Sequence, residues 1–400
     1  MVKLSTLVQL VESFAAPSLE VDAAHCLNAR YNKVACTRCA DACPTQAITV
    51  AGPAVTCDLD ACARCGLCLW ACPTGVFHQT YPPEDKLPAV IARQDTEALE
   101  LVCPAAREAA GRLPEARPVA TPRCLAALSP ARLIELADPD RTIWLNDSLC
   151  ADCPLAAAHE HILSAAQEAN AWLTLYERAG RIRLFTEAPP RLTDTPHPER
   201  LVDGSSPPVD RRAFLRGNLR GEAGLDVAAQ PVQAANPVSD RLGFRLPPER
   251  VRLLRQESAW PEPPNRWVEP EPLGLAAIEI DEDNCSLCGW CAGFCPTAAL
   301  QWQQQRGELM ITFQPLRCID CDICLAACPT EAVHKREQIP SGALRQTVLL
   351  AEGESHDCTR CGRPTAVRTG DLCVWCSHLT DTRSILEDVR RRYRPPGGET

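Results

Sequence analysis

Between residues 98 and 187 the chain alternates short apolar runs with longer segments of helical periodicity. The apolar runs predict strands at 98–102, 117–120, 141–145 and 181–185. Apolar residues at helical spacing predict helices at 131–137 and 155–180. Strands that alternate with helices favour a small parallel sheet, so we expect residues 83–190 to form an α/β domain.

Further patterns predict elements outside this domain. Residues 276–281 and 308–313 read as short strands. Near the N-terminus, apolar residues at helical spacing predict an amphipathic helix over residues 1–20: Leu4, Leu7, Val8, Val11 and Phe14. Gln9 and Glu12 interrupt the apolar core that a signal peptide would need. No stretch approaches the roughly 20 apolar residues that cross a bilayer, so we expect no membrane span.

Residues 191–273 contain no cysteine and are rich in proline. This composition predicts a semi-rigid, extended linker anchored on the other modules by Trp260 and Trp267; full disorder is the alternative. The sequence DRRAFLRG at 210–217 resembles a twin-arginine export motif, but it lies mid-chain and no apolar run follows it. We interpret it as a coincidence or an internal docking element. The charged tail at 381–400 is a candidate helix for docking a partner.

The amino-acid composition indicates that the chain binds metal. The chain has 400 residues and 25 cysteines, and most of the cysteines fall in tight C-x2-C blocks. Disulfide frameworks belong to short secreted chains, whereas grouped C-x2-C in a long chain indicates metal. Thiols stay reduced in the cytoplasm, which is the compartment we expect. The net charge of −10 disfavours nucleic acid and suits docking onto basic patches of redox partners.

The strongest cysteine pattern lies between residues 285 and 328, where C-x2-C-x2-C-x3-C-P occurs twice. This pattern resembles bacterial two-cluster ferredoxins over residues 274–336. Three cysteines of each run wrap one face of a [4Fe–4S] cubane, and the fourth reaches the other cluster. Site A would therefore use Cys285, Cys288, Cys291 and Cys328. Site B would use Cys318, Cys321, Cys324 and Cys295.

Residues 24–80 resemble the same ferredoxins, with a departure in the first run. Lys33 stands where the leading cysteine should be. We favour Cys26 as the replacement because a modestly longer loop adds little closure entropy. Site C would use Cys26, Cys36, Cys39 and Cys72, with a three-iron cluster or a labile open iron as the competitor. Site D would use Cys62, Cys65, Cys68 and Cys43. Cys57 is left over, and we interpret it as a buried structural cysteine.

Four cysteines of the α/β domain follow predicted strands: Cys103, Cys124, Cys150 and Cys153. The carboxyl ends of strands are where open α/β sheets place their sites. This middle site could hold a [2Fe–2S] cluster or zinc, or its thiols could be uncommitted. His159 and His161 on the following helix are expected to be solvated or packed rather than ligands.

The α/β segment resembles the delta subunit of methyl-viologen-reducing hydrogenases over about 90 residues, through the pattern CP…RCLAALSPARLIEL…LCADCP. The resemblance implies a [2Fe–2S] cluster at the middle site. It also implies electron transfer between a hydrogenase and a partner of the heterodisulfide-reductase type.

Two C-x2-C knuckles near the C-terminus bring together Cys358, Cys361, Cys373 and Cys376. Facing knuckles of this kind predict a structural zinc ribbon at 345–380, which we call the ribbon site. A rubredoxin-like iron has the same ligands and remains the alternative.

The expected fold is α+β and multidomain: ferredoxin-like 2[4Fe–4S] modules at 21–82 (module 1) and 274–340 (module 2) flank the α/β domain, and the zinc ribbon follows. The expected cofactors are four [4Fe–4S] clusters, a candidate [2Fe–2S] cluster and one zinc ion. No acid–base pair, nucleophile or glycine-rich nucleotide loop appears in the sequence, so we expect a non-catalytic, electron-transfer subunit of an oxidoreductase complex.

By analogy, the redox partner of such a subunit would be a formate dehydrogenase, a hydrogenase or an enzyme of the heterodisulfide-reductase type. Two alternatives remain. The middle site could reduce a small substrate, or the chain could be a maturation or scaffold protein for a partner oxidoreductase.

Overall fold

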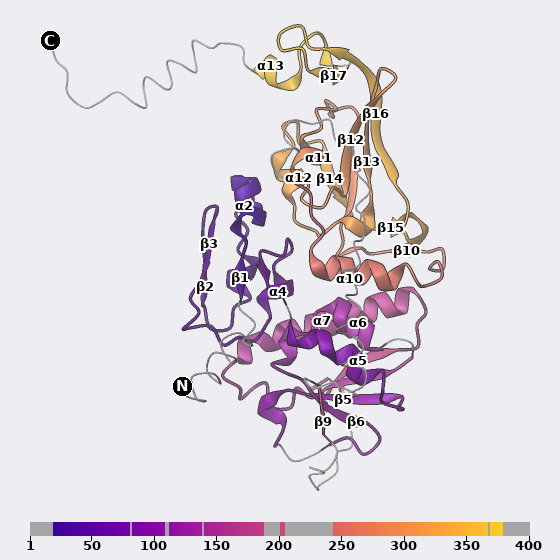
Figure 1. The fold of residues 1–400 in the computed structure, drawn as a ribbon. Helices are drawn as coiled ribbons and strands as arrows, with labels where there is room; N and C mark the ends of the chain where they lie inside the picture. The colour runs from indigo at the N-terminus through magenta and orange to yellow at the C-terminus, as the bar shows by residue number, and fades with distance from the viewer. Residues whose placement is uncertain are drawn as a thin grey trace, which may run out of the picture.

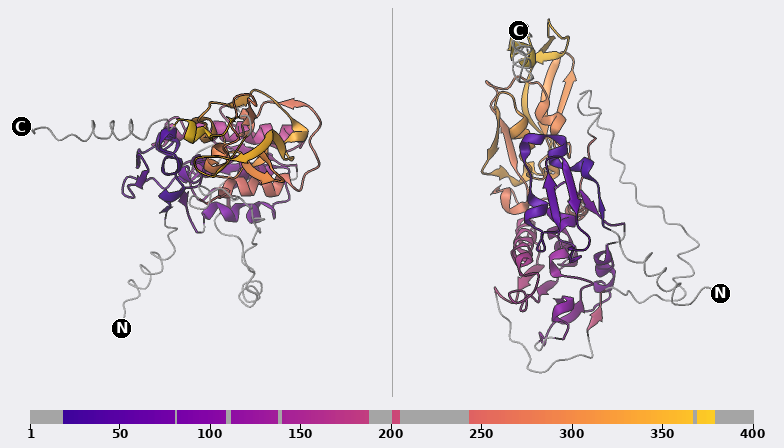
Figure 2. Two further views of the ribbon diagram at one scale, coloured as in Figure 1. Left: turned by 90° about the horizontal axis from the view of Figure 1, so that it is seen from above. Right: turned by 90° about the vertical axis from the view of Figure 1, so that its left-hand side faces the viewer.

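The computed structural model describes residues 19–80, 82–108, 112–137, 140–187, 201–204, 243–366 and 369–378. Within these ranges the chain forms an elongated body of three parts, with module 2 at one end, the α/β domain at the other and module 1 along one side (Figures 1 and 2). The expected N-terminal helix, the DRRAFLRG motif and the charged tail lie outside the described residues.

The α/β domain is built on a five-stranded parallel sheet with the order β8-β7-β5-β6-β9. Its strands are β5 (Ala98–Val102), β6 (Arg117–Ala120), β7 (Thr142–Leu145), β8 (Arg181–Leu184) and β9 (Val202–Asp203). The small parallel sheet expected from the sequence is therefore confirmed. Strand β9 was not expected, because two residues give no pattern of their own.

Helices α5 (Leu87–Ile91), α6 (Pro130–Ala137) and α7 (His159–Leu175) accompany this sheet. Consecutive residues are buried in the central strands β5 and β6 and alternate residues in β7 and β8, and Trp172 of α7 is the largest fully buried side chain among the described residues. Burying an aromatic side chain of this size stabilises the domain by about 3 kcal/mol. This shared core fixes the carboxyl ends of the strands relative to α7.

Part of the segment expected to be an extended linker is instead a helix, α10 (Pro248–Glu257), which packs on α6. Pro248 lies at its first turn, where the missing N–H costs nothing, and Leu253 is buried. Trp260 is buried as expected of an anchor, but Trp267 is 60% exposed and is not one. High proline content did not prevent a helix here, because the prolines lie in its first turn or outside it.

Module 1 consists of short elements around its cysteine loops. Its strands pair antiparallel as β1 (Glu20–Val21) with β4 (Phe77–His78), and β2 (Ile48–Ala51) with β3 (Ala54–Cys57). Its helices are α2 (Leu27–Arg30), α3 (Arg38–Asp41) and α4 (Cys68–Ala71). Its small core includes Phe77 and several of the cysteines themselves. A module with so little apolar burial depends on other links for its stability.

Module 2 pairs β11 (Ala277–Ile280) with β14 (Val333–Arg336), and places α11 (Trp290–Phe294) beside α12 (Ile323–Ala327). A second sheet has the order β12 (Leu300–Gln305), β13 (Glu308–Phe313), β16 (Val348–Asp357) and β17 (Pro364–Ala366). The strands expected at 276–281 and 308–313 correspond to β11 and β13. Strand β16 leads from module 2 into the ribbon. There β17 and then α13 (Val374–His378) follow it along the chain.

A buried polar cluster joins the segment directly after module 2 to the α/β domain, beside the pair β10 (Trp267–Val268) and β15 (Ile339–Pro340). The Glu257 carboxylate, 3% exposed, accepts hydrogen bonds from Tyr176, which directly follows α7, and from Arg345. Arg345 also donates to the Trp260 carbonyl oxygen over 3.0 Å. Removing either partner of a buried charged pair costs about 3–5 kcal/mol, so this cluster holds the two parts together.

Candidate metal centres

Module 2 gathers its eight cysteines into the two expected groups. Burial raises the pKa of the Cys291 thiol, and the neighbouring thiols of site A raise it further: Cys285, Cys288 and Cys328. The same causes act on Cys324 at site B, whose neighbours are Cys295, Cys318 and Cys321. Cys291 also acts on Cys324, so sites A and B are adjacent. Four buried thiols whose charges repel one another need a bound cation before all of them ionise.

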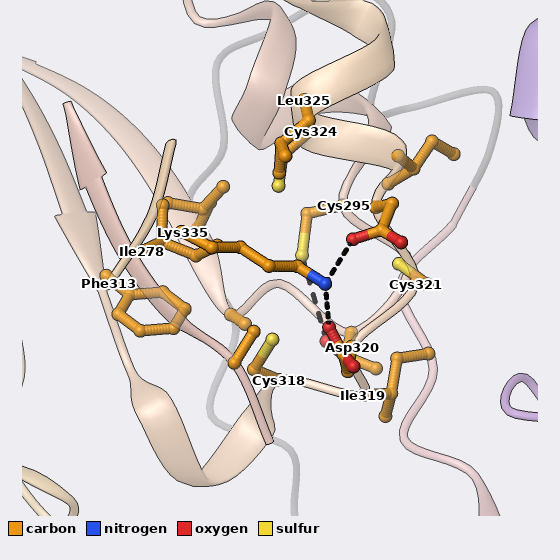
Figure 3. A pocket seen from close by; sticks show the side chains of 16 residues that line it. Ile278, Cys295, Phe313, Cys318, Ile319, Asp320, Cys321, Cys324, Leu325 and Lys335 are labelled. Carbon is orange, nitrogen blue, oxygen red and sulfur yellow. Dashed lines mark hydrogen bonds and ion pairs between the residues drawn. The ribbon is translucent and has the colours of Figure 1, made fainter. Parts of the chain in front are cut away.

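Site B surrounds a hollow in the protein. Cys295, Cys318, Cys321 and Cys324 line one cavity together with apolar side chains such as Ile278 and Phe313 (Figure 3). The Lys335 side chain also lines this cavity, and its ammonium lies 2.6 Å from a carboxylate oxygen of Asp320 and 2.6 Å from one of Asp322 (Figure 3). A lined hollow with four convergent thiols is the arrangement that a cubane requires.

Module 1 gathers site C across the irregular run. Burial raises the pKa of Cys39 to about 12, and the thiols of Cys72, Cys36 and Cys26 add to the effect. Helix α2 begins directly after Cys26, and the Asn28 side chain bonds both backbone groups of Cys36 at 2.7 and 2.9 Å. This pair of bonds closes the long loop, which brings Cys26 back to the other three cysteines.

Site D contains one thiol more than expected. Burial is the main cause that raises the pKa of Cys68. Four neighbouring thiols raise it further: Cys65, Cys62, Cys57 and Cys43. Cys57 ends strand β3 and is half-buried, and its pKa is raised to about 11 by burial and by Cys62 and Cys43. The cysteine interpreted as structural therefore lies beside a candidate metal site, which its position just before the second run could have indicated.

A threonine follows four of these cysteines at a fixed distance, in the tripeptide Cys-Pro-Thr. The hydroxyl groups lie 3.6–3.8 Å from the cysteine sulfurs in the pairs Cys43–Thr45, Cys72–Thr74, Cys295–Thr297 and Cys328–Thr330. Backbone N–H groups of Ala47, Val76 and Ala332 also donate to three of these sulfurs at 3.3–3.4 Å. Such donors stabilise thiolate ligands. Cysteine spacing alone missed the threonines, although the repeated tripeptide is visible in the sequence.

The middle site lies past the carboxyl ends of β5, β6 and β7, as the sequence suggests. Burial raises the pKa of Cys150 to about 12, and the thiols of Cys124, Cys103 and Cys153 contribute. The imidazole Nε2 of His159 lies 2.8 Å from a carboxylate oxygen of the fully buried Asp147. This histidine is therefore packed against the loop that carries Cys150 rather than directed at the thiols.

Site D and the middle site are in contact. The Cys65 thiol is among the charges that raise the pKa of Cys124, which reaches about 11 mainly through burial. The indole N–H of Trp70 donates to the Ala126 carbonyl oxygen over 2.8 Å, and its ring meets His161 edge to face at 6.5 Å. Gly66 is required here, because a Cβ at its positive φ of +85° would lie 2.8 Å from the Arg123 side chain.

Site C faces site B across the junction of the two modules. The Tyr31 hydroxyl donates to the Ala326 carbonyl oxygen over 3.2 Å, and its ring packs on Phe294 with centroids 4.9 Å apart. Arg38 donates to the Asp320 carbonyl oxygen. Cysteines of sites C and D pack in the same small core of module 1. The five cysteine groups therefore follow one another in space as middle site, D, C, B and A.

The ribbon site is the tightest group of cysteines. The sulfurs of Cys358, Cys361, Cys373 and Cys376 all lie within 4.8 Å of one another, and those of Cys361 and Cys373 are 3.7 Å apart. Zinc bound tetrahedrally to thiolates places sulfurs about 3.8 Å apart, since each Zn–S bond is about 2.3 Å. Trp375 of α13 packs on Trp290 of α11, with ring centroids 3.9 Å apart and the ring planes tilted by 31°. The ribbon is thereby fixed beside the helix that carries Cys291.

All 25 cysteines lie within the described residues, and none of them forms a disulfide there. Among the same residues no helix is both long and apolar enough to span a membrane. A search of curated proteins found no match.

Two family models match parts of the chain. Residues 284–332 match a 4Fe-4S dicluster domain, and residues 58–78 match a 4Fe-4S binding domain. These two ranges contain sites A and B, and the second cysteine run of module 1. The chain therefore contains two ferredoxin-type domains that bind iron–sulfur clusters, a class of cofactor that transfers electrons.

Proposed function

We propose that this chain is a multi-cluster electron relay that connects a partner oxidoreductase to its electron donor or acceptor. Sites A, B, C and D would each hold a [4Fe–4S] cluster, and the middle site a [2Fe–2S] cluster. The clusters supply reversible one-electron chemistry, while the chain positions them, buries them and donates hydrogen bonds to their thiolates. The ribbon site would hold a structural zinc ion.

The observation that carries this proposal is the unbroken row of cysteine groups. Trp70 and Cys65 link site D to the middle site, and Arg38 links the loop of site C to the loop of site B. A protein that stored clusters for delivery would not need every group to touch the next. A row with two separate ends suits a relay that serves one partner at each end.

The donor sets also fit the proposed cofactors. Each of sites A to D contains a thiol whose pKa is raised by burial and by neighbouring thiols, namely Cys291, Cys324, Cys39 and Cys68, which disfavours the empty, ionised state. A cationic iron core removes that penalty. The ribbon differs, because its four sulfurs are spaced for a single ion.

The proposed partner is a redox enzyme of the formate dehydrogenase, hydrogenase or heterodisulfide-reductase type, in the cytoplasm, where thiols remain reduced. The acidic net charge of −10 suits a basic docking patch on that partner. Neither nucleic acid nor a membrane is part of the proposal.

Electron uptake tests this function without knowledge of the partner. The full chain, purified without oxygen, is titrated with reduced methyl viologen while the visible absorbance of its clusters is followed. We expect about one electron per cluster, or about five per chain. The matched control is Cys57→Ser, which should take up the same number. A chain that contains its iron but accepts no more than one electron would contradict a relay.

A further inference from the structure

Four arginines from four segments of the chain converge on site B. Arg30 belongs to α2, Arg38 to α3, Arg250 to α10, and Arg317 precedes Cys318. Arg30 interacts electrostatically with Cys295 and Cys321, Arg38 with Cys321, Arg250 with Cys318, and Arg317 with Cys295. Every thiol of site B except Cys324 thus has a guanidinium close to it.

Backbone carbonyl oxygens, which are neutral, accept a hydrogen bond from each of these arginines and leave the charges of Arg38 and Arg317 uncancelled. Arg38 donates to Asp320 over 2.5 Å, and the Nε of Arg317 donates to Thr297 over 3.0 Å. Arg250 donates to Gly274 over 2.8 Å, and Arg30 donates to the Gly243 carbonyl oxygen. All four residues that accept these bonds lie outside α-helices and strands, so the arginines also fix loops around the site.

Arg250 is the most enclosed of the four. It is 8% exposed, and within the part of the chain that the structure describes its Nη1 has no hydrogen-bond partner. Glu168 of α7 is its neighbouring carboxyl group. A buried donor without a partner beside Cys318 is the kind of group that a sulfide of a bound cluster would satisfy.

Among the described residues, two carboxylates, Asp320 and Asp322, line the cavity of site B. Lys335 is paired with both Asp320 and Asp322, so this trio carries a single net negative charge (Figure 3). With Glu168 also ionised, two net negative charges would face four guanidinium groups. Site B therefore lies in a positive environment.

Site A differs from site B. The main influences on the thiols of Cys288 and Cys291 are burial, backbone N–H groups and other thiols. The loop that leads into Cys285 carries three consecutive acidic residues, Asp281, Glu282 and Asp283, at the surface. Within the described parts of the chain, no guanidinium is among the main influences on Cys288 and Cys291, so site B has the more positive surroundings of the two.

We propose that the four arginines give site B the more positive reduction potential of the two sites in module 2, so that the first electron entering module 2 resides at site B. Reduction adds one negative charge to a cluster, and positive charges nearby stabilise the reduced form. Because Arg30 and Arg38 belong to module 1, docking of module 1 contributes to this preference. The inference rests on the proposed function, since both sites must hold clusters.

A redox titration followed by electron paramagnetic resonance tests the proposal on the full, anaerobically purified chain. The conservative ligand variant Cys321→Ser marks the signal of site B by changing its line shape. We expect Arg38→Gln and Arg317→Gln each to shift the midpoint potential of that signal to more negative values, and the other signals to move less. Arg38 is exposed, so its replacement leaves the fold intact. Arg317→Lys, which keeps the charge, should leave the midpoint potential of site B close to that of the parent chain.

The matched control is Arg255→Gln, on the exposed face of the helix that carries Arg250. It makes the same charge change away from the cysteines and should leave the site B potential unmoved. If the site B signal does not shift in Arg38→Gln and Arg317→Gln, or shifts equally in Arg255→Gln, the inference is wrong. If the parent chain holds no clusters in module 2, the proposed function fails first, and iron analysis of that chain distinguishes the two cases.

Discussion

The Arg38 guanidinium donates a hydrogen bond to the carbonyl oxygen of Asp320 over 2.5 Å, across 282 residues of sequence. Arg38 lies between two cysteines of site C, and Asp320 lies between two cysteines of site B. One hydrogen bond therefore joins the two metal-binding loops that face each other across the junction of modules 1 and 2. The first prediction follows from this bond.

Replacing Arg38 by alanine should loosen the junction without unfolding either module. A hydrogen bond to a charged donor contributes about 1.5–3 kcal/mol, and Tyr31 retains its own contacts there. We expect faster amide hydrogen exchange in residues 318–324, measured by mass spectrometry. Arg64→Ala is the matched control, because Arg64 occupies the same position in the C-x2-C loop of site D. Equal exchange in the two variants would show that the bond does not hold the junction.

The Cys-Pro-Thr threonines should tune the clusters. Thr297 is 1% exposed, and its hydroxyl lies 3.7 Å from the Cys295 sulfur. Thr297→Val keeps the shape but removes this donor, so the site that uses Cys295 should become harder to reduce, with a more negative midpoint potential. Thr297→Ser, which keeps the hydroxyl, is the control. An unchanged midpoint potential in Thr297→Val would show that the Thr297 hydroxyl does not tune this cluster.

Cys26 and Cys57 should behave differently when each is replaced by serine. The structure places Cys26 with Cys36, Cys39 and Cys72, whereas Cys57 lies beside a site that already has four thiols. Cys26→Ser should lose or destabilise one cluster, at a cost of up to about four irons per chain. Cys57→Ser should keep its iron. The reverse result would exchange the roles of these two cysteines.

Glu168 should make the stability of the chain fall as the pH rises. Burial raises the pKa of its carboxyl group to about 7, and Arg250 only partly offsets the effect. The folded state then holds a proton that the unfolded chain releases near pH 4.5, so the free energy of unfolding decreases between about pH 4.5 and 7. In thermal melts over this range, Glu168→Gln should show a smaller fall in Tm than the parent chain. Parallel curves for the two proteins would contradict this role.

Much of the fold could be predicted because it is encoded locally. The strands that became β5, β6 and β7 are short apolar runs between turn residues, and α7 shows a clear helical period. Residues 248–257 were harder, because flanking prolines mask a helix whose stability comes from packing on α6. Local composition does not report such tertiary contacts.

Some features of the candidate sites could likewise be predicted from local sequence, and others could not. The regular runs of module 2 allow each cysteine to be assigned from spacing alone, and the dicluster match covers all eight. The positions of Arg30 and Arg250 beside site B could not be predicted, since each comes from a distant segment and carries no motif. The same holds for the position of Cys57, which depends on how strand β3 meets the loop of site D.

Iron and sulfide analysis of the full chain tests the central claim most directly. The chain is purified without oxygen, and iron, acid-labile sulfide and zinc are measured per chain. Four cubanes and one [2Fe–2S] cluster predict about eighteen irons with matching sulfide, together with one zinc at the ribbon site. Fewer than about eight irons per chain, in protein whose two ferredoxin-type domains are folded, would contradict a multi-cluster relay.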